Sequence, residues 1–311
     1  MVKAVYIGSD EFSAEILREL LRMDKINIVA IATYPDIPHG RGHKLLPTPV
    51  KQAAQEAGLP IVEVADVSNP EIHRSLSSLG AAMAILVSFK IVPNEFLNAF
   101  SKGVVNLHPS LLPDLRGAAP IQWAIMRGYA KSGITTFLVS EKLDAGNILM
   151  QKEFPISDNE TAGEFFAKII VPGAILLAET IDVYASGELK PIEQAGGQIN
   201  RAPRILHKHR IIDWQWNSAK IHNRIRGLSP DPGALTTIKG KNFRILRSQI
   251  ILCENIGLPG ELANINSKEI IVSTANGAIS ILEIQPEGRQ KMTAQEFIRG
   301  YIRNQKIFFG S

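Results

Sequence analysis

Cysteine is nearly absent from this sequence of 311 residues, which contains only Cys253. A single cysteine excludes an internal disulfide framework and a zinc site built from several thiolates, and it is typical of a protein that works in a reducing compartment. Cys253 directly follows the apolar run from Ile250 to Leu252. We therefore expect a buried thiol at this position and not a nucleophile.

Long apolar runs are missing as well. No stretch of the sequence approaches the roughly 18 apolar residues of a membrane span. The N-terminus contains one lysine and a short apolar run, without the longer apolar segment and small-residue cleavage site of a secretory signal. These absences predict a cytoplasmic protein that does not associate with a membrane.

Negative charge is scarce in the last third of the chain. Residues 1–200 contain 17 lysines and arginines against 22 acidic residues, a net charge of −5, whereas residues 201–311 contain 17 against 8, a net charge of +9. A basic module of this kind favours a polyanionic partner, because neutralising phosphates releases counterions. A basic domain that is merely soluble remains the alternative.

The length predicts two domains, with one large α/β domain as the alternative. The first 190 residues alternate short apolar runs rich in β-formers with segments of helical period, a pattern typical of a mostly parallel, doubly wound sheet. A helix with Phe12 and Leu20 on its buried face should follow the first strand, capped by Ser9 or Asp10. Strands are predicted at 2–8, 28–33, 61–64, 82–88, 103–107, 133–139 and 148–154, and further helices at 48–57, 69–78, 93–99, 118–127 and 160–186.

The turn after the first strand argues against a dinucleotide cofactor. It reads Gly8-Ser9-Asp10-Glu11-Phe12 and lacks the G-x-G-x-x-G spacing. Its two carboxylates would also repel a pyrophosphate at the helix N-terminus. A nicotinamide or flavin dinucleotide is therefore disfavoured.

A linker and a second domain are predicted after the α/β region. Residues 188–206 contain two prolines and a glycine pair without sustained periodicity, so we expect domains at 1–187 and 207–311 with this linker between them. A helix near 217–227 and five short strands separated by turn signals favour a small barrel of the OB type. Thr293 and Glu296 form a capping-box pattern at the start of a closing helix, about 293–303. The barrel strands are predicted at 233–238, 241–252, 259–264, 268–273 and 277–285.

Candidate catalytic side chains follow the strand at 103–107. Period-two alternation places Asn106 and His108 on the same side at the carboxyl end of this strand, where ligands bind in open α/β sheets. Asn106 offers an amide donor to a developing oxyanion, and His108 can hold or move a proton near neutral pH. Asp144, two residues before Gly146, adds a carboxylate that could orient the imidazole. Alternatively, Asn-x-His could lie in an ordinary surface loop, and Asp144 could be a turn former or a helix cap.

These residues carry a resemblance to the folate-dependent formyltransferase superfamily. The pattern is present as Asn106-Leu107-His108, then Ser110-Leu111-Leu112-Pro113, Arg116-Gly117, Pro120-Ile121-Gln122 and Asp144-Ala145-Gly146, and the similarity extends over nearly the whole chain. The resemblance implies that Asn106, His108 and Asp144 surround the transferred formyl group. It also implies that Ser110, Leu111, Leu112 and Pro113 lie in the folate site, with 10-formyltetrahydrofolate as donor and no metal.

The sequence departs from the superfamily pattern at Ser88-Phe89-Lys90, where many relatives have a Tyr-Gly pair. We expect Phe89 and Lys90 at the mouth of the folate pocket, where Lys90 could contact the glutamate tail of the folate. An exposed lysine at a strand end is the alternative. Tyr34, where relatives often carry glutamine, could stack on a terminal base.

The acceptor is indicated by residues 34–50, which resemble the loop that the methionyl-tRNA-modifying branch of the superfamily places against the tRNA acceptor stem. Arg41, His43 and Lys44 are its candidate contacts, because the arginine fork suits phosphates and base edges. Together with the basic second domain, this resemblance implies a monomeric enzyme that formylates initiator methionyl-tRNA for translation initiation. A formyltransferase for a nucleotide-linked amino sugar and a non-catalytic RNA-binding protein remain as alternatives.

Overall fold

The computed structural model describes the whole chain except residues 40–43, 198, 255, 265–268 and 302–306. The described residues form two compact units. The first unit comprises residues 1–117, 133–154 and 166–201, and the second comprises residues 118–132, 155–165 and 202–311. The chain therefore leaves the first unit twice, for two short segments, before the second unit is completed.

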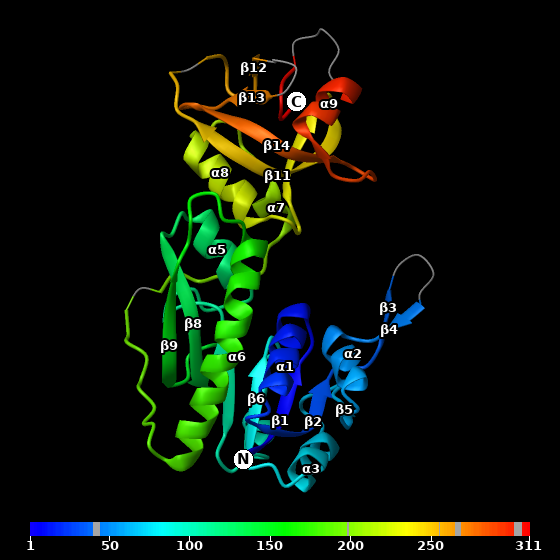
Figure 1. Cartoon of the computed structure of the whole chain (residues 1–311), viewed down its shortest axis with the longest axis vertical. Coiled ribbons are helices and arrows are strands. Elements are labelled where there is room, and N and C mark those ends of the chain that lie inside the picture. The colour runs from blue at the N-terminus through cyan, green and yellow to red at the C-terminus, as the bar shows by residue number, and fades with distance from the viewer. Residues whose placement is uncertain (40–43, 198, 255, 265–268, 302–306) are drawn as a thin grey trace. The chain divides into compact units, whose positions relative to one another are not determined.

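The first unit is built on one seven-stranded sheet, with the strand order β5-β2-β1-β6-β7-β8-β9 (Figure 1). Strands β1, β2, β5, β6 and β7 run parallel, and β8 is antiparallel to β7. This sheet confirms the predicted mostly parallel α/β fold. The strands are β1 (Lys3–Gly8), β2 (Asn27–Thr33), β5 (Ile61–Glu63), β6 (Met83–Val87), β7 (Val104–His108), β8 (Lys131–Leu138) and β9 (Ile148–Pro155).

Helices cover both faces of this sheet (Figure 1), which explains why β1 and β6 at its centre are almost entirely apolar. Residues 4–7 of β1 are fully buried, as expected for a parallel strand between two helical layers. On one face, α6 brings Gly173 against Ile16 of α1 and Leu107 of β7. The helices are α1 (Glu11–Met23), α2 (Pro49–Glu56), α3 (Pro70–Ser78), α4 (Asn94–Leu97) and α6 (Ala162–Ser186).

Local sequence signals set the ends of several of these helices. The carboxylate of Asp10 accepts a hydrogen bond from the Ser13 N–H at 2.9 Å and caps α1. Of the two predicted caps, Ser9 and Asp10, the second is therefore confirmed. Thr48 and Asn69 cap α2 and α3 in the same way, each followed by proline in the first turn.

Among the described residues, no helix combines the length and the apolar character that a membrane crossing needs.

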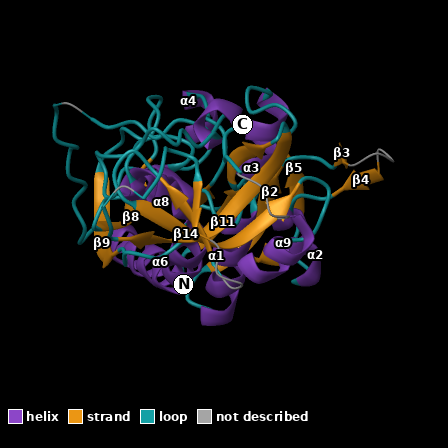
Figure 2. Ribbon diagram, turned by 90° about the horizontal axis from the view of Figure 1, so that it is seen from above, coloured by secondary structure: helices purple, strands orange, loops and turns teal. Residues whose placement is uncertain are grey.

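A short hairpin that the sequence patterns do not predict follows β2. Its strands β3 (Ile37–His39) and β4 (Lys44–Leu46) are antiparallel and project from the body of the first unit in both views (Figures 1 and 2). Of the predicted tRNA contacts, Lys44 begins β4. Arg41 and His43 lie outside the described residues.

The second unit contains an antiparallel sheet in the order β10-β11-β14-β13-β12, with β15 paired to β14. Its apolar core joins sheet residues such as Ile245 and Ile281 to Ile225 of α8 and Phe297 of α9. The elements are α5 (Pro120–Met126), α7 (His207–Arg210), α8 (Ser218–Gly227), β10 (Ala234–Ile238), β11 (Lys241–Ile251), β12 (Leu262–Asn264), β13 (Ile270–Ser273), β14 (Ala278–Pro286), β15 (Met292–Thr293) and α9 (Ala294–Tyr301).

The C-terminal residues join the two edges of this curled sheet. Phe309 forms a bridge with Ile238 of β10, and Phe308 forms one with Glu261, next to β12. The Leu262 N–H donates to the Ile307 carbonyl at 3.0 Å, and the Gly310 N–H donates to the Thr237 carbonyl at 2.7 Å. The sheet is a half-barrel of antiparallel strands, which confirms the predicted OB-like class. Cys253 is only partly buried, contrary to the sequence expectation, because β11 ends at Ile251 and residues 252 and 253 lie beyond the sheet.

Candidate active site

Asn106 and His108 lie together at the carboxyl end of β7. Both side chains are buried, with exposed fractions of 9% and 6%. Asn106 faces Leu86 of β6 on one side of the strand ladder and Phe137 of β8 on the other. Since successive side chains alternate along a strand, the two polar groups share one face of the sheet, as the spacing predicts.

The two ring nitrogens of His108 have different partners. Nε2 lies 3.0 Å from the carbonyl oxygen of Leu115, which can only accept, so this nitrogen carries a proton and donates it. Nδ1 faces Oδ2 of Asp144 at 3.9 Å, close enough for an ion pair and too long for a direct hydrogen bond. A proton that arrives at Nδ1 would therefore give an imidazolium directly opposite a carboxylate.

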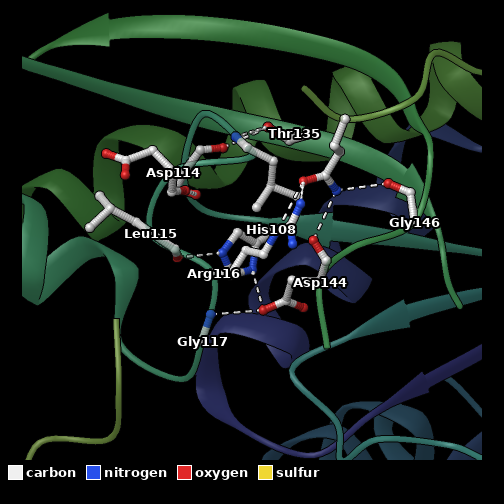
Figure 3. A network of polar contacts seen from close by, with 11 residues as sticks. His108, Asp114, Leu115, Arg116, Gly117, Thr135, Asp144 and Gly146 are labelled. Carbon is white, nitrogen blue, oxygen red and sulfur yellow. Dashed lines mark hydrogen bonds and ion pairs between the residues drawn. The ribbon is translucent and has the colours of Figure 1, made fainter. Parts of the chain in front are cut away.

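Asp144 is held by the backbone of the loop that follows β7. Its Oδ2 accepts a hydrogen bond from the Gly117 N–H at 2.8 Å. Asp144 itself has a φ of 49°, in the left-handed region. Figure 3 shows its carboxylate directed at both the Gly117 backbone and the His108 ring, while Leu115 contacts the ring from the other side.

Gln194 joins the two loops that carry these contacts, and sequence reasoning missed it. Its Oε1 accepts from Nε and Nη2 of Arg116 at 3.0 and 2.6 Å. Its Nε2 donates to the carbonyl oxygens of Asp144 and Gly146 at 2.9 and 2.7 Å. Gln194 lies within the predicted linker, among prolines and glycines, and no local sequence signal marks it, because its partner Arg116 is 78 positions away.

The segment Ser110-Leu111-Leu112-Pro113 is fixed by contacts with β8. Thr135 Oγ1 donates to the Ser110 carbonyl at 2.7 Å and accepts from the Leu112 N–H at 3.1 Å. The side chain of Leu111 packs closely against Gly133, where a Cβ would lie 2.4 Å from it. These contacts set the path of the loop between His108 and Leu115.

A pocket of about 40 Å³ opens beside the catalytic candidates. It brings together four of the residues predicted from sequence, namely Phe89, Lys90, Asn106 and Asp144. His108, Ser110, Leu111, Leu112 and Pro113 are not part of its wall. Its other lining residues are Leu86, Ile91, Val92, Phe137, Val139, Ser140, Lys142 and Leu143. Among the described residues, no three His, Cys, Asp or Glu side chains are arranged to hold a metal ion.

Tyr34 forms part of the same region through Phe89. The two rings are stacked with centroids 4.4 Å apart and an interplanar angle of 12°. The Lys90 N–H donates to the Tyr34 hydroxyl at 3.3 Å, and the Lys90 ammonium lies 5.3 Å from the centre of the Tyr34 ring. Tyr34 therefore supports the pocket wall, and burial raises the pKa of its phenol.

Comparison with known proteins identifies the family. Residues 2–181 match the model of the formyl transferases, and residues 204–302 match that of the formyl transferase C-terminal domain. The chain is 38% identical over 302 residues to the methionyl-tRNA formyltransferase of Bacillus mycoides strain KBAB4, covering 96% of each protein. The chain belongs to the methionyl-tRNA formyltransferase family. The formyltransferase of Geobacillus sp. strain WCH70 is also 38% identical, over 96% of this chain and 95% of its own.

Solved structures share the fold of this formyltransferase. WlaRD, described as a sugar 3N-formyl transferase in the presence of dTDP and 5-N-formyl-THF, superposes with a TM-score of 0.66. Its sequence identity is 20%, and the match covers 93% of this chain and 99% of that one. The resemblance noted in the sequence is thus confirmed for the enzyme class, while the roles of individual residues rest on the geometry described above.

Proposed function

We propose that this enzyme transfers the formyl group of 10-formyltetrahydrofolate to the α-amino group of methionine on initiator methionyl-tRNA, for translation initiation, as a monomer in the cytoplasm. The observation that carries the chemistry is the meeting of Asn106, His108 and Asp144 beside one pocket at the carboxyl end of β7. The acceptor is supported by full-length similarity to two methionyl-tRNA formyltransferases.

The pocket chemistry fits part of a folate. Leu86, Val92 and Phe137 give it an apolar wall, and Lys90 and Lys142 place positive charge beside it, which suits a flat ring system with an anionic tail. The pocket volume of about 40 Å³ is large enough for the formyl group. A pocket that holds a whole ligand as large as a folate usually measures about 300–1,000 Å³.

The donor supplies the one-carbon unit, and the protein stabilises the charge that develops during transfer. When the amine attacks the formyl carbon, negative charge grows on the formyl oxygen. Asn106 Nδ2 would donate a hydrogen bond to this oxygen, and the positive charge of a protonated His108 ring nearby would stabilise it. Asp144 Oδ2, 3.9 Å from Nδ1, would face the positive charge of that ring. The amine loses one proton and N10 of the folate gains one as the carbon–nitrogen bond to the donor breaks. Asp144 and a bridging water would guide that proton.

The remaining residues are assigned positions around this centre. Ser110, Leu111, Leu112 and Pro113 would support the folate from the loop that Thr135 fixes. Lys90 would meet the glutamate tail, since it lines the pocket and its ammonium is exposed. Arg41, His43 and Lys44 would contact the acceptor stem.

The decisive experiment is a single-turnover formylation assay with purified protein and 10-formyltetrahydrofolate. Charged initiator tRNA, charged elongator methionyl-tRNA and a nucleotide-linked amino sugar are supplied in parallel. We expect formylation of the initiator tRNA above the other two. Formylation of the amino sugar alone would overturn the acceptor assignment, and failure with all three would leave a protein that only binds RNA.

A further inference from the structure

Tyr34 joins the wall of the candidate pocket to the root of the β3–β4 hairpin. It lies between the end of β2 at Thr33 and the start of β3 at Ile37. Its ring is stacked on Phe89 with centroids 4.4 Å apart, and its hydroxyl accepts a hydrogen bond from the Lys90 N–H at 3.3 Å. The same residue therefore contacts the pocket wall and leads directly into the hairpin.

The part of the pocket wall that Tyr34 contacts is itself held in place. Phe89 lines the pocket and follows Ser88 at the end of β6. Ser88 has a φ of 51°, in the left-handed region, and its carbonyl accepts a hydrogen bond from Oγ of Ser9 at 3.0 Å. The loop after β1 thus constrains the backbone before Phe89, which gives the Tyr34 ring a fixed support.

The root of the hairpin is tied to the first unit on both sides. Before β3, the carboxylate of Asp36 pairs with the ammonium of Lys51 on α2, which also pairs with Glu63 at the end of β5. The hydroxyls of Thr33 and Thr48, which flank the hairpin in the chain, are hydrogen-bonded at 2.7 Å. The short segment between β2 and β3 has little slack, because each residue spans at most about 3.6 Å. Its position is therefore passed on to the hairpin.

The hairpin has little support of its own. Strands β3 and β4 form a separate two-stranded sheet, and a two-stranded hairpin is marginally stable at best in water. Ile37 and Leu45 are 57% and 59% exposed, so these side chains add little packing against the rest of the unit. The orientation of the hairpin therefore depends on the contacts at its root, and the Tyr34 stack links those contacts to the pocket.

We propose that Tyr34 is a positioning residue, which through its stack on Phe89 fixes the root of the β3–β4 hairpin relative to the donor pocket. The inference rests on the proposed function, in which Lys44 of this hairpin contacts the acceptor. The Tyr34 ring then acts on acceptor binding and not on the transferred group, and Phe89 influences the acceptor through Tyr34. Direct stacking of an RNA base on Tyr34 is the competing explanation, and a double-mutant cycle separates the two.

The test measures steady-state formylation of initiator methionyl-tRNA by the full-length protein, with the folate donor kept saturating. Tyr34→Leu should raise KM for the tRNA about three- to tenfold, the order expected for the loss of one aromatic pair, and should change KM more than kcat. Phe89→Leu should raise KM for the tRNA by a similar factor, and the double variant should be no worse than Tyr34→Leu alone. Tyr34→Phe keeps the stacked ring and should restore a KM near that of the wild type.

Tyr184→Leu is the matched control, because Tyr184 on α6 is a half-buried tyrosine of the same unit. Equal rises of KM in Tyr34→Leu and Tyr184→Leu would overturn the inference, since they would reflect a general loss of structure. Additive effects of Tyr34→Leu and Phe89→Leu would overturn it in favour of a base stacked directly on Tyr34. If Tyr34→Leu does not fold, Phe89→Leu decides: an unchanged KM for the tRNA contradicts the positioning role.

The wild type separates this inference from the proposed function. If it formylates initiator methionyl-tRNA while the variants keep its KM, only the role of Tyr34 fails. If the wild type does not formylate the tRNA, the proposed function is wrong and the positioning role falls with it.

Discussion

Replacing Gln194 with glutamate separates two halves of one contact network at the active site. The substitution is nearly isosteric and keeps an oxygen facing Arg116, which donates from Nε and Nη2. It replaces the amide nitrogen, which donates to the carbonyls of Asp144 and Gly146, with an oxygen that can only accept. The Arg116 half of the network should survive, and the half that anchors residues 144–146 should fail.

The magnitude follows from the lost bonds. The two carbonyl oxygens lose their donors, and the one on buried Gly146 has little access to water as a replacement, at a cost of about 1–3 kcal/mol for each acceptor left unsatisfied. The new charge pair with Arg116 offsets part of this loss, by about 1–2 kcal/mol. The cost of two unsatisfied acceptors less this offset leaves a folded protein that we expect to be about 1–4 kcal/mol less stable.

The catalytic effect should exceed the effect on stability. Asp144 faces His108 Nδ1 at 3.9 Å, and a shift of its loop by about 1 Å can cost about 100-fold in rate. In steady-state assays kcat should fall by that order, with KM for the folate donor nearly unchanged. The Gln194→Met substitution removes the hydrogen bonds to Arg116 as well as those to residues 144 and 146. This variant should be as slow as Gln194→Glu and less stable. Gln55→Glu, on the exposed face of α2, is the control.

Wild-type turnover by a folded Gln194→Glu enzyme would refute the positioning argument. A large rise in KM without loss of kcat would also contradict it, because Gln194 would then act on the donor site. The comparison with Gln194→Met excludes a purely structural effect, since such an effect would scale with the loss of stability.

Three further outcomes test the geometry. Asn106→Ala and Asp144→Ala should each lower kcat by about 100-fold or more while folate binding measured by titration is largely kept, and loss of affinity alone would contradict their roles. Gly146→Ala should lower the melting temperature strongly, because its Cβ would lie 1.6 Å from the Leu138 carbonyl oxygen, whereas Gly196→Ala meets nothing within 4 Å and should be neutral. Burial lowers the pKa of His222 below its usual 6.5. The free energy of unfolding should therefore fall by up to about 1.4 kcal/mol when the pH is lowered from 7.5 to 5.5, and this pH dependence should be absent in His222→Gln.

The sign for His222 follows from its contacts. In the folded protein the ring is neutral, with Nε2 donating to the Asp158 carbonyl and Nδ1 accepting from Ser248, each at 3.0 Å. A proton at Nδ1 would replace an acceptor with a donor in a buried site, so the unfolded chain binds protons first as the pH falls. Denaturant unfolding at pH 7.5 and 5.5 measures the difference in the free energy of unfolding. An equal difference in the wild type and in His222→Gln would contradict the assignment.

The sequence predicted the sheet because buried parallel strands leave strong local signals. Residues 4–7 and 83–87 form uninterrupted apolar runs, and the helices between them carry caps such as Asp10 that fix where they begin. The placement of Asn106 and His108 followed from strand periodicity alone. The folate and tRNA contacts rested on family resemblance, and they remain predictions.

The features that escaped prediction depend on contacts between residues far apart in the chain. Gln194 lies 78 positions from Arg116 and 50 from Asp144, in a segment whose prolines and glycines resemble a free linker. The hairpin of β3 and β4 has strands of only three residues, too short for a periodic signal. The closing pairs of Phe308 and Phe309 are likewise long-range.

The proposed catalytic residues Asn106, His108 and Asp144 therefore differ from the residues that hold them in how the sequence encodes them. Asn106 and His108 are fixed by one strand, but the ring tautomer of His108 depends on the Leu115 carbonyl and the place of Asp144 depends on Gly117. Both of those residues belong to the loop from which Arg116 reaches Gln194. The Gln194 amide thus couples the orientation of His108 and Asp144 to the segment at 188–201, so we expect that segment to belong to the scaffold of the proposed active site.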